Sequence, residues 1–259
     1  MMSRRKLEAR GSEEESTGSK GLSAKGYVNV PARIGGARPV WKTRESQPGV
    51  ASRRLRTPAM TDPFPDAPYA EALPPLATPR LQLRALTEAD DPAIVALFSD
   101  EAALATWTHP PFTSLDDARA YRAQLDEAYR RRASFIWGVF DAAGSLAGVA
   151  ILTRWAPLHR RADLGYYLGS AYWGRGYATE AGRALLAFAF DRLGVHRVEA
   201  EVVPGNAASA RVLVRLGFRR EARLKERLWG SAEGGDGPFD SDLFRLFRRE
   251  FAASAPEAE

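Results

Sequence analysis

The stretch Gly165-Tyr-Tyr-Leu-Gly-Ser-Ala-Tyr-Trp-Gly-Arg-Gly-Tyr-Ala-Thr-Glu-Ala181 runs from an apolar, strand-like segment through a glycine-rich turn into an amphipathic helix. The first amides of a helix lack acceptors within the helix, and they lie at the positive end of its dipole. Glycine also lets a phosphate approach the backbone closely. We therefore predict an anion-binding turn over 174–178, with Arg175 adding a positive charge. A lone Gly-x-Gly turn more often caps a buried helix, so other residues have to support this site.

A second polar motif follows one strand further along the chain. Asn206-Ala-Ala-Ser209 opens a helix that ends near Leu216-Gly-Phe218, and glycine is a common residue at helix ends. Asparagine and serine often cap helices, so either residue alone predicts no more than a cap. The combination of this motif with the preceding glycine turn favours a ligand site between them.

The other segments predict a mixture of strands and helices. Apolar alternation indicates strands over about 80–86, 134–140, 146–155, 161–168, 196–203, 218–229 and 240–250. Helical spacing and capping residues indicate helices over 87–97, 114–132, 174–194 and 207–216. Strands and helices do not alternate strictly, so the order is typical of an α+β domain and not of a Rossmann sheet.

The charge is distributed unevenly along the chain. Residues 1–60 contain 13 Lys and Arg but five Asp and Glu, whereas the remainder contains 24 and 27. The folded part is therefore mildly acidic, which disfavours nucleic acid as a partner of the domain.

Composition also predicts the boundaries of the folded part. Residues 1–79 are rich in Gly, Pro, Ser and charge without apolar periodicity, so we expect a disordered basic leader. A domain over 80–251 and a disordered tail over 252–259 follow. The leader is either a partner-binding arm, suggested by Arg53-Arg54-Leu55-Arg56, or a non-functional extension upstream of a start at Met60. We favour the second interpretation.

Several classes of site are excluded by composition. Cysteine is absent, which rules out disulfides, thiolate metal sites and cysteine nucleophiles. The three histidines, His109, His159 and His196, lack metal-ligand spacing, so we expect no metal. The chain has neither a bilayer-spanning apolar run nor the apolar segment of a secretory signal. We expect a cytoplasmic protein without a membrane partner.

Taken together, these motifs resemble the GNAT superfamily of N-acetyltransferases, most closely its RimJ/RimL-like branch, named after enzymes that acetylate N-termini of ribosomal proteins. The similar segments, in order, are Thr78-Pro-Arg-Leu-Gln-Leu-Arg84, Asp163-Leu-Gly-Tyr166, Trp173 to Ala181, Asn206 to Ser209 with Leu216-Gly-Phe218, and Asp240 to Phe247. Trp173 departs from the superfamily, which has Gln or Arg before the first glycine. The resemblance implies a single domain with a mostly antiparallel mixed sheet of about seven strands, flanked by about four helices.

The resemblance also implies an activity. The protein would be a transferase that moves an acetyl group from acetyl-CoA, its co-substrate, to a primary amine. The acceptor would be a protein N-terminal amine, of the ribosomal-protein type, or a small-molecule amine such as an aminoglycoside or a polyamine. A non-catalytic CoA-binding regulatory module is the alternative. The oligomeric state is left open, with a homodimer among the alternatives.

The family pattern carries over to particular cofactor-binding residues here. The backbone around 166–168 would lie along the pantetheine arm, the turn would hold the pyrophosphate, and the amide N–H near Leu168 would face the oxyanion. The expected cofactor-binding residues are Tyr167, Leu168, Gly174, Arg175, Gly176, Tyr177, Ala178, Thr179 and Asn206.

The catalytic assignments follow from what the reaction needs, a base for the amine and a proton for the leaving thiolate. Ser209 is the expected proton donor, with helix capping as its alternative role. Asp163, acting through a water, and Glu201 or Glu199 on the next strand are candidates for the general base.

Other conspicuous residues receive structural or peripheral roles. Tyr166, Tyr172 and Trp173 are interpreted as core or cleft walls, and Glu180 as a residue that suits the helix dipole. The acceptor cleft is expected to be flanked by Trp107, His109, Phe112 and the loop 230–237.

Overall fold

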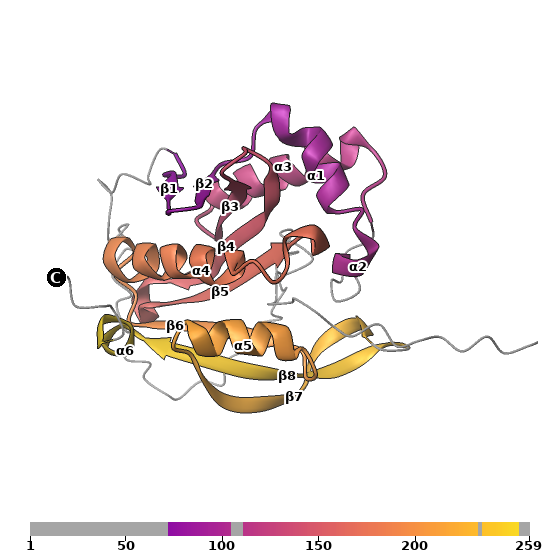
Figure 1. Cartoon of the computed structure of the whole chain (residues 1–259). Helices are drawn as coiled ribbons and strands as arrows, with labels where there is room; N and C mark the ends of the chain where they lie inside the picture. Colours follow the sequence, from indigo (N-terminus) through magenta and orange to yellow (C-terminus); the bar gives the residue numbers. More distant parts are fainter. Residues whose placement is uncertain (1–71, 105–110, 233–234, 254–259) are drawn as a thin grey trace, which may run out of the picture.

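A mixed sheet of eight strands, in the order β1-β2-β3-β4-β5-β6-β8-β7, forms the centre of the computed structural model, which describes residues 72–104, 111–232 and 235–253 (Figure 1). The strands are β1 (Leu76–Ala77), β2 (Leu81–Arg84), β3 (Ser134–Asp141), β4 (Leu146–Ala156), β5 (Arg161–Leu168), β6 (Arg197–Val202), β7 (Arg219–Ala232) and β8 (Gly235–Phe247). Neighbouring strands are antiparallel except β5 and β6, which are parallel. The predicted α+β mixed sheet is thereby confirmed.

Helices cover both faces of this sheet. They are α1 (Asp91–Leu97), α2 (Glu101–Leu104), α3 (Leu115–Arg130), α4 (Tyr177–Ala187), α5 (Ala207–Arg215) and α6 (Arg248–Ala253). Figure 1 shows α4 and α5 on one face, with α1 and α3 across the sheet from them. None of the described helices is long and apolar enough to cross a membrane.

Side-chain alternation along the strands produces a core on each face. Leu164 and Tyr166 of β5 pack in the cluster that contains Leu185 of α4, whereas Tyr167 packs in the cluster of α1 and α3. Phe112, expected beside the acceptor cleft, is buried in this second core, with its ring centroid 4.9 Å from that of Phe98. Phe112 therefore has a core role, and its expected place beside the acceptor cleft stays a prediction.

The parallel pairing of β5 and β6 is short, and this creates the site. It covers only the three pairs from Arg161↔Arg197 to Asp163↔Glu199. Beyond Asp163, β5 continues to Leu168 while paired with β4 alone. The sheet therefore opens after Asp163, and both α4 and α5 begin at this opening.

Regular secondary structure is present before Arg80. β1 pairs with β2 through Leu76↔Leu83, and the indole Nε1 of Trp137 donates to the Pro74 carbonyl at 2.7 Å. Residues 72–79, expected to belong to the leader, thus contact the domain. Residues 1–71 and 254–259 lie outside the described part of the chain.

The C-terminal hairpin differs from expectation at both ends. The strand predicted to reach Glu250 ends at Phe247, because the Glu250 carboxylate accepts from the Phe247 amide at 3.0 Å and from Arg245 Nη1, and α6 begins at Arg248. At the other end, the paired arms extend to Ala232 and Gly235, into the segment expected to be a loop.

Candidate functional site

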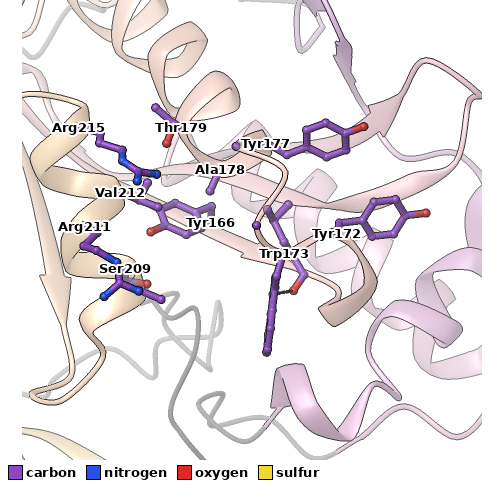
Figure 2. A pocket seen from close by; sticks show the side chains of 14 residues that line it. Tyr166, Tyr172, Trp173, Tyr177, Ala178, Thr179, Ser209, Arg211, Val212 and Arg215 are labelled. Atoms are coloured by element: carbon purple, nitrogen blue, oxygen red, sulfur yellow. Dashed lines mark hydrogen bonds between the residues drawn. The ribbon is translucent and has the colours of Figure 1, made fainter.

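A cavity of about 450 Å³ lies where β5 separates from β6, between the beginnings of α4 and α5 (Figure 2). The segment from β5 to α4 contributes Tyr166, Leu168, Tyr172, Trp173, Gly174, Gly176, Tyr177, Ala178 and Thr179. Helix α5 contributes Ala208, Ser209, Arg211, Val212 and Arg215. This lining contains arginines but neither Asp nor Glu, so it suits an anionic ligand.

One wall of the opening is an unpaired strand edge. The Gly169 amide donates to Ala147 at 3.0 Å, so the neighbouring pair Gly148↔Leu168 is of the non-hydrogen-bonded type. The backbone groups of Leu168, and of Tyr166 two residues earlier, therefore point away from β4 into the opening. Trp173 Nε1 donates a hydrogen bond to the Leu168 carbonyl at 2.9 Å. The Leu168 amide N–H is thus the group of this residue that faces the cavity.

The glycine turn has the geometry expected of an anion site. Gly174 and Gly176 have φ values of 75° and 79°, in the left-handed region that favours glycine. In the described part of the chain, no backbone acceptor is paired with the amides of residues 174–179. These amides converge at the positive end of the α4 dipole.

A half-buried carboxylate holds this turn in place. Glu180 accepts hydrogen bonds from Thr78 Oγ1 at 2.6 Å, from the Arg80 amide at 2.9 Å and from Arg80 Nε at 2.7 Å. Arg80 Nη1 also donates to the Arg175 carbonyl at 3.0 Å. Burial opposes ionisation, but these donors keep the pKa of Glu180 below its ordinary value. Glu180 therefore anchors the N-terminal segment to the turn, a larger role than dipole compensation.

Two buried hydroxyls face the cavity without partners. Ser209 is 1% exposed and Tyr166 is 4% exposed, and neither hydroxyl has a hydrogen-bond partner among the described residues. Asn206, and not Ser209, caps α5, since its Oδ1 accepts from the Ser209 amide at 3.0 Å. Burial raises the pKa of Tyr166, and the nearby Ser209 hydroxyl opposes that rise. Both groups are thus available to donate to a ligand.

The candidate carboxylates share one guanidinium. Arg154 Nη2 donates to Glu201 at 2.8 Å and forms an ion pair with Asp163, and Ser241 Oγ donates to Glu201 at 2.9 Å. Burial opposes ionisation of Glu201, but these donors hold its pKa below the ordinary value. Burial raises the pKa of Asp163 to about 6, although Arg154 opposes the rise. Burial and the shared guanidinium therefore shift the pKa values of the two carboxyls in opposite directions.

Asp163 lies at the point where the opening begins. It is the last β5 residue paired with β6, and it alternates with Leu164, which packs against the α4 face. Its side chain is therefore on the opposite face of the sheet from α4 and α5. Asp163 is 3% exposed and lies outside the cavity lining.

The predicted site residues fall into two groups. Leu168, Gly174, Gly176, Tyr177, Ala178, Thr179 and Ser209 line the cavity. The others do not: Tyr167 (whose hydroxyl donates to Leu97), Arg175 (which lies over the Tyr172 ring), Asn206, Asp163 and Glu201. Trp107 and His109 lie outside the described residues.

Sequence reasoning missed the stripe of α5 that lines the cavity. Arg211, Val212 and Arg215 received no role in it, although their spacing with Ala208 is that of one helix face. Tyr166, interpreted as a core or cleft wall, does line the cavity, because its position two residues before Leu168 places both on one strand face. No group of metal-ligating side chains occurs among the described residues.

A sheet that splits beside a parallel strand pair, with a glycine turn and two helix N-termini at the split, defines a protein that binds an extended, phosphate-bearing ligand. Residues 80–219 match the acetyltransferase (GNAT) domain family, and the chain belongs to this family. Enzymes of this family use acetyl-CoA, so the chain is an acetyl-CoA-dependent N-acetyltransferase.

Relatives and solved structures agree with this assignment. The uncharacterized N-acetyltransferase p20 of Bacillus licheniformis is 30% identical over 181 residues, which cover 68% of this chain and 98% of p20. The ribosomal protein uS5 alanine N-acetyltransferase of Escherichia coli is 30% identical over 112 residues, 42% of this chain and 58% of that enzyme. The fold is shared with RimL, a ribosomal L7/L12 α-N-protein acetyltransferase solved with coenzyme A. The TM-score is 0.60 and the identity is 23%, and the match covers 67% of this chain and 98% of RimL.

Proposed function

We propose that this enzyme acetylates a protein N-terminal amine, of the kind presented by ribosomal proteins. The observation that carries the proposal is the Asp163 carboxyl at the start of the opening, whose pKa is about 6. An α-amine has a pKa of about 8, whereas an alkyl amine such as lysine is near 10.4. Any base takes a proton from an α-ammonium more readily than from an alkyl ammonium, because the α-ammonium is the stronger acid. A carboxyl whose pKa is raised only to about 6 comes closer to the pKa of an α-amine than to that of an alkyl amine, and therefore suits the α-amine better. The similarity to the uS5 alanine N-acetyltransferase supports the same acceptor class.

Each step of the transfer has a proposed group. Asp163, through a water, takes the proton that the ammonium must lose, and the neutral nitrogen attacks the thioester carbon. The Leu168 amide donates to the oxyanion that forms. When the carbon–sulfur bond breaks, Ser209, supported by Tyr166, gives its proton to the departing thiolate. The proton that the newly bonded nitrogen loses restores the Ser209 hydroxyl, so that the products are the amide and free coenzyme A. Glu201 is less suited to be the base, because Arg154 and Ser241 already bind its oxygens.

The acceptor is tested with the full chain and acetyl-CoA, by following thiol release and the mass of the product. Peptides that begin with Ala or Ser are compared with the same peptides blocked at the N-terminus and carrying an internal lysine. Spermidine and an aminoglycoside form the small-molecule arm. We expect acetylation of the free α-amine only. A higher kcat/KM for spermidine or the aminoglycoside than for any free peptide would overturn the acceptor and leave the enzyme class intact.

A further inference from the structure

One stripe of α5 faces the cofactor cavity along its length. Ala208, Arg211, Val212 and Arg215 follow the spacing of a single helix face, and all four line the cavity. The two small side chains leave space between α4 and α5, and the two arginines are exposed at its rim. Figure 2 shows both arginines on the α5 wall, across from the glycine turn and Trp173.

These arginines differ from Arg80 and Arg154, whose charges are already paired. Arg80 is paired with Glu180, and Arg154 with Asp163 and Glu201. No ion pair among the described residues includes Arg211 or Arg215, and no carboxylate lines the cavity. A cation in the last helical turn favours the dipole, which accounts for Arg215 but not for Arg211 in the middle of α5. Two uncompensated positive charges thus border a cavity built for an anion.

The acetyl donor contains a group that matches these two positive charges. Coenzyme A has a pyrophosphate and, separately, a ribose 3′-phosphate. The free amides of the glycine turn suit the pyrophosphate, but they lie on the wall opposite α5. A phosphate monoester carries between one and two negative charges near neutrality, and arginine binds such groups with paired donors. We propose that Arg211 and Arg215 bind the ribose 3′-phosphate, so that the enzyme distinguishes coenzyme A from 3′-dephospho-coenzyme A.

Binding measurements with the two cofactors test this assignment. Calorimetry would give the Kd of coenzyme A and of 3′-dephospho-coenzyme A for the full chain, for Arg211→Gln, for Arg215→Gln and for the double variant. We expect the native chain to prefer coenzyme A by roughly tenfold or more, the size of one or two charge-assisted contacts at a partly exposed site. In the double variant the affinity for coenzyme A should fall to that for the dephospho form, which itself stays unchanged.

Arg192→Gln is the matched control. Arg192 is an exposed arginine just beyond the C-terminal end of α4, away from the cavity lining, and its loss should leave the preference intact. The proposal is overturned if the native chain binds both cofactors equally. It is also overturned if the double variant weakens both by the same factor, which would place the arginines on the pyrophosphate or show a damaged fold. No acceptor amine is present, so failure of the proposed acceptor leaves this result unaffected.

Discussion

Ser209 and Tyr166 place two hydroxyls inside the protein with no described partner, a state that costs roughly 1–3 kcal/mol for each group. Native proteins satisfy nearly all buried polar groups, and exceptions are commonly explained by a function or an unseen ligand. Both hydroxyls line the cavity, and we propose that the thioester end of acetyl-CoA is the ligand that accounts for them.

Ser209→Ala separates catalysis from capping. Because Asn206 caps α5, the thermal midpoint should change little. The catalytic rate should fall by roughly 10²-fold, since a donor to the leaving group is lost. Thiol-release assays measure the catalytic rate, and thermal melts on the same samples measure the midpoint. A variant that melts earlier but turns over normally would remove Ser209 from the mechanism.

The raised pKa of Asp163 predicts how activity depends on pH. Its pKa of about 6 lies above the ordinary 3.8, so kcat/KM should fall as the pH drops through about 6 and the base is protonated. The same shift affects stability, because the folded protein binds a proton at Asp163 more tightly than the unfolded chain does. This difference adds to the free energy of unfolding in full below about pH 4, and the contribution is lost as the pH rises through about 6.

Two variants test that assignment through pH profiles of kcat/KM. Asp163→Asn should abolish the acidic limb along with most activity. Glu199→Gln should keep the activity and move the limb to lower pH, because the charge of Glu199 raises the pKa of Asp163. An unchanged limb in both variants would assign the base elsewhere.

At the scale of elements, the glycine turn, the segment just before β2 and the first turn of α4 form one anchored unit. The contacts of Glu180 with Thr78 and Arg80 join segments about 100 residues apart. This arrangement holds the free amides of the turn in position before a ligand arrives, which lowers the ordering cost of binding.

Gly176→Asp should remove cofactor binding without unfolding the protein. An aspartate at φ 79° is strained, but its Cβ would lie 3.4 Å from Arg80 Nη2, a cation that offsets part of this cost. The new charge occupies the place of the pyrophosphate, and acetyl-CoA affinity should fall by roughly 10²-fold or more. Gly144→Asp, in the open β3–β4 turn at φ 80°, has the same backbone strain and should bind normally. Equal affinity in both variants would place the phosphates elsewhere.

For the whole molecule, the boundary of the domain has a consequence that truncation can measure. A chain that starts at Met60 should keep its thermal midpoint and its acetyl-CoA affinity, since residues 1–59 lack a core-forming pattern. A chain that starts at Arg80 loses β1, the packing of Leu73 and Leu76, and the Trp137 bond to Pro74. Its midpoint should drop by roughly 5 °C or more. A comparable drop on starting at Met60 would extend the functional domain into the leader.

Local patterns in the sequence determined most elements and the cofactor side of the site. The glycine turn, the motif from Asn206 to Ser209 and the strand before the turn are each contained within a few residues, so their spacing already predicts their conformation. The same reasoning failed at Glu250, where one side chain bonds a backbone amide three residues earlier and replaces a strand end with a helix.

Only the tertiary structure decided which distant groups meet. Arg154 between Asp163 and Glu201, Tyr166 beside Ser209, and Glu180 on Arg80 all depend on which strands become neighbours and where β5 and β6 separate. Burial and neighbouring charge set the pKa of Asp163 and leave the two hydroxyls without partners, and neither quantity exists until the sheet is assembled. The type of each residue is therefore a property of the sequence, whereas its chemical role in this site is a property of the fold.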